Sequence, residues 1–85
     1  MRSRISEKLF VMARVKSYMS EKLCVKGSEI NDNTTFDKDL SMNFEDRLEF
    51  FMNVQIKFNV PDVPFELENV GELIDHLDLM INGTK

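Results

Sequence analysis

The chain has 85 residues, of which 42% are hydrophobic and 31% charged, a composition that excludes a fibrous or disordered protein and predicts one domain over residues 1–85. Its single cysteine, Cys24, excludes an internal disulfide, and we expect a small core side chain in a reducing, cytoplasmic protein with no membrane span. Residues 31–85 carry twelve acidic and four basic side chains, which argues against nucleic acid as the main partner and favours the basic surface of another protein.

Apolar residues at three- and four-residue spacing predict a first amphipathic helix over residues 5–23. Ser3 or Ser6 is the expected N-cap, and Gly27 with Ser28 marks the exit from the helix. The side chains expected to face the core are Ile5, Leu9, Met12, Val15, Met19 and Leu23, flanked by Val11 and Tyr18.

The second predicted helix covers residues 43–58. Asn43 is the expected N-cap with Asp46 three residues on, and Glu45, Asp46 and Lys57 complement the helix dipole. Its broad apolar stripe predicts packing on more than one side of the helix, through Phe44, Leu48, Phe51 and Phe58, with Met52 and Val54 widening the stripe.

Two connections and a last helix complete the expected fold. The loop over residues 27–36 is rich in turn formers, but the regular placement of Ile30, Phe36 and Leu40 predicts that it packs against the helices. Pro61 and Pro64 interrupt the segment after residue 58, so any further helix there is short or missing. The last helix is predicted over residues 70–81, capped by Asn69 and Glu72, with its apolar stripe on Val70, Leu73, Ile74, Leu77 and Ile81. The sequence therefore predicts an all-α bundle of three main helices with a packed long loop.

The sequence motifs that mark common active sites are absent from this chain. It contains no glycine-rich phosphate loop and no cluster of cysteine and histidine that would bind a metal. His76 is the only histidine and lies off the apolar stripe, where we expect it to be exposed, so no nucleophile and base pair can be assembled. Glu45 and Asp46 sit at an exposed helix start, without the burial that acid–base catalysis by a carboxyl group needs. We therefore expect a protein that is not an enzyme.

Short matches to a known family recur in a fixed order along residues 11–77. They are Arg14-Val15-Lys16, Leu23, Val25-Lys26, Glu29-Ile30, Asp32-Asn33, Phe36, Asp39-Leu40, Glu49, Met52, Phe58, Val70, Ile74-Asp75 and Leu77. This order resembles the acyl carrier protein family. The resemblance implies a 4′-phosphopantetheine arm on a serine at the start of the second helix, which carries acyl groups between enzymes, and acidic residues on that helix that meet basic patches of those enzymes.

The sequence departs from the family motif at the attachment residue. Counting on from Asp39-Leu40, the modified serine falls on Phe44, which has no hydroxyl group. We therefore expect a monomeric, acyl-carrier-protein-like module with no cofactor that docks on the basic surface of a partner or acyl-processing enzyme through Phe44, Glu45, Asp46 and Glu49. The Phe44 ring is expected to close the top of the core, or else to plug the acyl-chain entrance or contact a partner.

Two alternatives remain open at the level of sequence. Ser41 has a hydroxyl and follows Asp39-Leu40, so the chain can instead be a genuine acyl carrier protein with 4′-phosphopantetheine on Ser41. Its other role would be that of a loop or capping residue. The chain can also be a small helical adaptor that pairs with another protein through its phenylalanine- and methionine-rich second helix.

Overall fold

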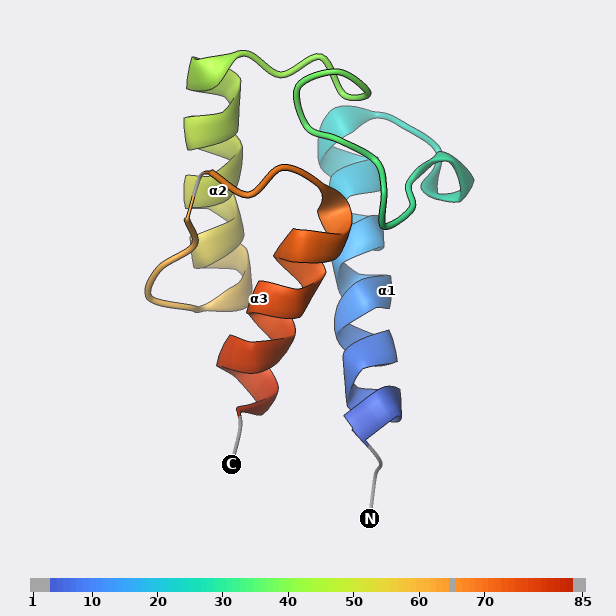
Figure 1. Ribbon diagram of the computed structural model, residues 1–85, viewed down its shortest axis with the longest axis vertical. Coiled ribbons are helices and arrows are strands. Elements are labelled where there is room, and N and C mark those ends of the chain that lie inside the picture. Colours follow the sequence, from blue (N-terminus) through green and yellow to red (C-terminus); the bar gives the residue numbers. More distant parts are fainter. Residues whose placement is uncertain (1–3, 65, 84–85) are drawn as a thin grey trace.

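The computed structural model describes residues 4–64 and 66–83, and three helices account for most of them. Helix α1 spans Arg4–Leu23, α2 spans Phe44–Phe58 and α3 spans Val70–Asn82, with a 3-10 turn, η1, at Gly27–Glu29. Helix α1 runs in the direction opposite to α2 and α3, so α1 begins and α3 ends at the same end of the bundle (Figure 1). The predicted all-α bundle is confirmed, and none of the helices among the described residues is long and apolar enough to cross a membrane.

The start and the exit of α1 differ from the expectation. The expected cap at Ser3 lies outside the described residues, whereas Ser6 lies inside the helix and does not cap it. Cys24 follows the last helical residue with φ of 59°, a left-handed conformation that turns the chain. Its side chain is exposed, so the expected core placement is wrong. The neighbours on either side of it, Leu23 and Val25, pack against the core instead.

The hydrophobic core lies between the three helices and the loops that join them. In α1 the buried line runs through Val11, Val15 and Met19, so the expected core position of Leu9 is wrong. Ile81 is also exposed, because the last turn of α3 extends beyond the end of α2 (Figure 1). The buried core side chains are Val11, Val15, Met19, Ile30, Phe36, Met42, Phe50, Phe51, Val54, Phe58, Val60, Val63, Val70, Leu73, Ile74 and Leu77.

The loop between α1 and α2 packs against α2 through aromatic rings. The Phe36 ring is fully buried, 5.2 Å from the Phe51 centroid in an edge-to-face contact and 5.8 Å from the Phe50 centroid. Ile30 is buried and Leu40 half-buried, which confirms that this loop is packed. The inner face of α2 consists of Phe50, Phe51, Val54 and Phe58. The predicted wide apolar stripe is wrong at Met52, because that side chain is exposed.

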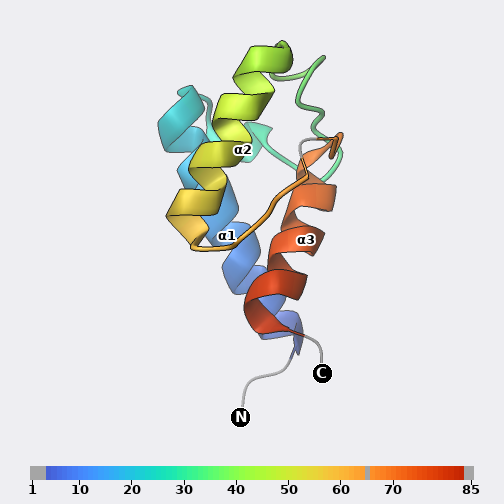
Figure 2. The same ribbon diagram turned by 90° about the vertical axis from the view of Figure 1, so that its left-hand side faces the viewer.

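The connection from α2 to α3 runs back from the end of α2 to the start of α3 (Figure 2). Its described residues contain no helix, which agrees with the expectation of a short or missing one. Hydrogen bonds hold it at both ends, because Gln55 Oε1 accepts from the Val63 amide at 3.0 Å and Arg47 Nη2 donates to the Leu67 carbonyl at 2.6 Å. His76 Nε2 lies 2.9 Å from the Asp62 carbonyl, so this histidine is half-buried rather than fully exposed.

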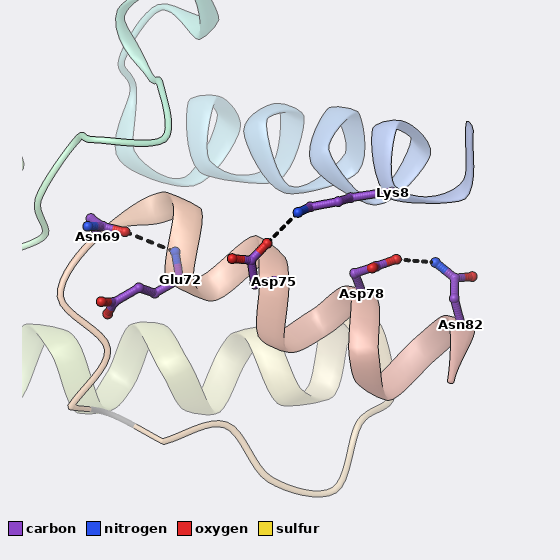
Figure 3. Close-up of polar contacts among 6 residues, drawn as sticks. All are labelled: Lys8, Asn69, Glu72, Asp75, Asp78 and Asn82. Atoms are coloured by element: carbon purple, nitrogen blue, oxygen red, sulfur yellow. Dashed lines mark hydrogen bonds and ion pairs between the residues drawn. The ribbon is translucent and has the colours of Figure 1, made fainter. Parts of the chain in front are cut away.

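Polar contacts fix α3 against α1 and define its start (Figure 3). Lys8 Nζ lies 2.6 Å from Asp75 Oδ1, and this hydrogen bond raises the pKa of Lys8 above its ordinary value. Asn69 Oδ1 accepts from the Glu72 amide at 2.9 Å, which confirms the predicted N-cap. The reciprocal bond of a capping box, from the Asn69 amide to the Glu72 carboxylate, is not formed. The Glu72 carboxylate accepts from the Glu68 amide at 2.8 Å instead. Asp78, which is 5% exposed, accepts from the Asn82 amide group at 2.7 Å.

The first turn of α3 lies directly against the loop that precedes α2. The Gly71 amide donates to the Asp32 carbonyl at 2.9 Å, and a Cβ at position 71 would lie 3.0 Å from that same oxygen. We therefore expect Gly71→Ala to lower the free energy of unfolding by about 1 kcal/mol net, although alanine favours a helix over glycine by about 1 kcal/mol. Urea denaturation followed by circular dichroism measures this change.

Gly27→Ala is the matched control, since a Cβ at position 27 meets nothing within 4 Å. We expect its unfolding midpoint to equal or exceed that of the wild type. A Gly71→Ala protein as stable as the Gly27→Ala protein would contradict the close approach of α3 to the loop.

Candidate docking and attachment site

The start of α2 is held by a reciprocal pair of hydrogen bonds. Asn43 has an extended backbone, and its Oδ1 accepts from the Asp46 amide at 2.8 Å. The Asp46 carboxylate in turn accepts from the Asn43 amide at 3.3 Å. These two bonds satisfy amide groups that a helix start otherwise leaves unpaired, and they confirm the predicted capping box. The backbone of the first turn of α2 is therefore held in place, and its side chains leave the helix in defined directions.

Phe44 is the first residue of α2, and its side chain is 60% exposed. The expectation that its ring closes the top of the core is wrong. Met42, two residues earlier, is buried in the core, and its amide donates to the Phe36 carbonyl at 3.0 Å. This hydrogen bond draws Met42 inward, whereas the inner face of α2 begins only at Phe50. The ring at the helix start is therefore accessible to another molecule.

The carboxylates predicted to contact a partner lie on the same helix start. Glu45 and Asp46 are in the first turn of α2 and Glu49 lies one turn further on, and all three are exposed. The structure thus brings Phe44, Glu45, Asp46 and Glu49 together along the first two turns. The first two turns of α2 therefore present three carboxylates and one aromatic ring to the solvent.

Ser41 lies in the turn that leads into α2. It is exposed and has φ of 57°, a left-handed conformation that is uncommon for a residue with a side chain. A shallow groove of about 300 Å³ opens beside it, between the end of α1 and the first turns of α2. The groove is lined by Lys22, Leu23, Leu40, Ser41, Met42, Asp46, Glu49, Phe50 and Asn53. The Ser41 hydroxyl can chemically carry a phosphodiester, but it precedes the helix by three residues.

Two exposed apolar residues lie on the outer side of α2. The core-facing stripe predicted from the sequence includes Met52 and leaves out Ile56, yet their side chains are 60% and 77% exposed. Their four-residue spacing from Leu48 was the available signal, since it follows one line along a helix. Among the described residues, no group of three or more histidine, cysteine, aspartate and glutamate side chains is arranged to hold a metal ion.

The fold and the exposed, capped start of α2 define a small helical bundle of the carrier type. No family model matches the chain. It is 36% identical over 66 residues to the acyl carrier protein of Chlamydia caviae, an alignment that covers 74% of this chain and 86% of the relative. It is 31% identical over 71 residues to acyl carrier proteins of two strains of Porphyromonas gingivalis, covering 80% of this chain and 91% of each relative. The chain belongs to the acyl carrier protein family.

The capping box at the start of α2 makes a measurable contribution to stability. Asn43→Ala removes the oxygen that accepts from the Asp46 amide, so we expect it to lower the free energy of unfolding by about 1 kcal/mol. Asn43→Asp keeps an acceptor at the same place and should stay near the wild-type value. Chemical denaturation of the three proteins tests this, and equal midpoints for Asn43→Ala and the wild type would contradict the cap.

Proposed function

We propose that the chain is an acyl-carrier-protein-like module that docks on enzymes of acyl metabolism, as a cytoplasmic monomer, without a phosphopantetheine arm. The observation that carries this proposal is the position of Phe44. It is the first residue of α2, where the family resemblance puts the modified serine, and its side chain consists of carbon and hydrogen alone. No phosphodiester can form on this side chain, so the residue at the family's attachment position does not fit the group.

The helix start that would present the arm is nevertheless intact. The Asn43–Asp46 capping box is formed, and the loop before α2 is pinned by the buried Phe36 ring. A chain that had lost all carrier-type binding would gain nothing from an exposed aromatic ring at this place, because an exposed ring costs solubility. The capped helix start is present, whereas the residue at its first position, Phe44, has no hydroxyl. This combination supports docking on a partner without a phosphopantetheine arm.

The proposed docking surface consists of Phe44, Glu45, Asp46 and Glu49. The ring supplies an apolar anchor, and burial of a side chain of this size contributes about 2 kcal/mol. The three exposed carboxylates on the same two turns of the helix add negative charge, which would speed the encounter with a basic surface more than it adds to the affinity. An acyl-processing enzyme that offers lysine and arginine around an apolar recess fits this arrangement.

A genuine carrier with the arm on Ser41 is the second candidate. The specific observation in its favour is that Ser41 is exposed and lies beside the groove at the start of α2. In that case the arm would leave the chain one turn before the helix rather than from its first residue. A small helical adaptor is the third candidate and needs neither residue to be modified.

The arm is tested by intact-mass measurement after incubation with coenzyme A and a promiscuous phosphopantetheinyl transferase. We expect no mass increase for the wild type, because Phe44 has no hydroxyl. We expect Phe44→Ser to gain the mass of one arm, because it restores the hydroxyl on an intact, capped helix start.

Ser41→Ala is the control that separates the candidates. A mass increase of the wild type that is lost in Ser41→Ala would overturn the proposal and establish the second candidate. If Phe44→Ser and the wild type both stay unmodified, the helix start is not read by the transferase, and the adaptor is favoured over a carrier-like module.

A further inference from the structure

A second groove lies between α1 and the last turn of α2, at the opposite end of α2 from the capped helix start. Two adjoining shallow hollows of about 290 and 420 Å³ form it, and Tyr18, Glu21 and Lys57 line both of them. We name it the basic groove, and the lining residues that define it are Phe10, Arg14, Tyr18, Glu21, Lys22 and Lys57.

Positive charge prevails in the basic groove. Arg14, Lys22 and Lys57 are exposed, and Glu21 is the only carboxylate among the described lining residues. Within residues 4–64 and 66–83, none of the three cations forms an ion pair with a carboxylate. The chain as a whole has a net charge of -4, so the groove is a confined region of the opposite sign.

The groove residues of α1 form one line along that helix. Phe10, Arg14, Tyr18 and Lys22 follow one another at four-residue spacing. Arg14 and Lys22 are therefore separated by about 12 Å along the helix axis. Lys57 faces this line from α2, since its Nζ atom lies 6.0 Å from the Tyr18 ring centroid. The positive charges are thus spread along an elongated surface instead of being gathered at one point.

Aromatic rings hold the cations without neutralising them. The Arg14 guanidinium carbon lies 5.0 Å from the Phe58 ring centroid and 5.8 Å from the Phe10 ring centroid. Such contacts restrain a cation through the quadrupole of the ring and leave its charge available to an anion. Burial raises the pKa of the Tyr18 hydroxyl above its ordinary value, and the charge of Glu21 raises it further. Tyr18 therefore remains a neutral hydrogen-bond donor beside the cations at neutral pH.

The spacing of the charges decides which kind of anion fits the groove. A single phosphate or carboxylate group does not reach both Arg14 and Lys22. An extended peptide advances about 6.6 Å for every two residues, so carboxylates at alternate positions meet cations spread over about 12 Å. A second copy of this chain would meet the groove with its acidic part, a head-to-tail contact that continues into an open chain of molecules instead of a closed pair. An anionic lipid surface would be repelled by the negative charge on the rest of the chain.

We propose that the basic groove binds an extended acidic segment of a partner protein. Carboxylates of this segment pair with Arg14, Lys22 and Lys57. An apolar side chain of the segment contacts the Phe10 ring, which is 57% exposed. This groove takes a partner of the opposite charge to the one proposed for the start of α2, and it needs neither the presence nor the absence of a phosphopantetheine arm.

The test uses a synthetic peptide of about ten residues with glutamate at alternate positions and one leucine near its end, and a second peptide with glutamine in place of every glutamate. Fluorescence anisotropy of the labelled peptides measures binding to the full chain at about 50 mM and about 500 mM NaCl. We expect the glutamate peptide to bind more tightly than the glutamine peptide, and less tightly at high salt. The double variant Lys22→Glu/Lys57→Glu should weaken its binding at least about tenfold.

The matched control is Lys26→Glu/Lys38→Glu. It changes the net charge by the same amount at two exposed loop lysines that do not line the groove, so it should bind within about threefold of the wild type. Circular dichroism checks that the variants are folded. Absence of binding, equal binding of the two peptides, or equal weakening by the two double variants would overturn the proposal.

Glu21→Gln gives a second measurement that does not depend on the double variant being folded. It removes the opposing charge of the groove at nearly constant size, so we expect it to tighten binding of the glutamate peptide by about threefold. Weaker binding by Glu21→Gln would contradict a groove that selects negative charge.

Sedimentation velocity and vesicle flotation test the other occupants. Self-association of the wild type that Lys22→Glu/Lys57→Glu abolishes would replace the partner segment by further copies of the chain. Binding to phosphatidylglycerol vesicles that depends on Lys22 and Lys57 would replace it by a lipid surface. Modification of Ser41 in the mass assay would overturn the arm-less function but leave peptide binding at the basic groove unchanged, so the two proposals fail separately.

Discussion

The contact of the Phe36 ring with Phe50 and Phe51 is the interaction on which the arrangement of this bundle depends. Helices α1 and α3 approach each other closely along their lengths, whereas α2 stands further off and is held through long side chains. The three rings fill that wider space, with centroids 5.2 to 5.8 Å apart. Because Phe36 belongs to the loop, the same contact orders the chain that leads into α2 and thereby sets where the helix starts.

This dependence explains why α2 has two faces with different roles. Its inner face is used completely by the aromatic contacts, which tie the helix to the loop and, through Phe58 and Tyr18, to α1. Its outer face is left with apolar side chains that the small bundle has no further layer to cover. These side chains form an exposed apolar face on the side of the helix that is turned away from the core.

At the start of α2, the features that fix the backbone are distinct from the side chain that would react. The cap, the packed loop and the first-turn carboxylates depend on backbone hydrogen bonds and on buried rings, and all of them are present. In the function proposed above, the reaction that loads a carrier finds no hydroxyl on the first residue of α2, which is Phe44. A binding surface consists of many contacts, so it can keep its function when one residue changes. A covalent attachment depends on one reactive group and is lost with it.

The sequence by itself determined the three helices and the N-caps of α2 and α3. Helix bounds followed from apolar spacing and from Asn43 and Asn69, because capping is a local interaction between residues three apart. The register that places Phe44 at the helix start likewise needs no tertiary information. Tertiary structure alone decided which side of each apolar stripe is buried. Phe44, Met52 and Leu9 read as core residues because periodicity shows only that they share a side of a helix, whereas burial depends on where the neighbouring elements end and how far their rings reach.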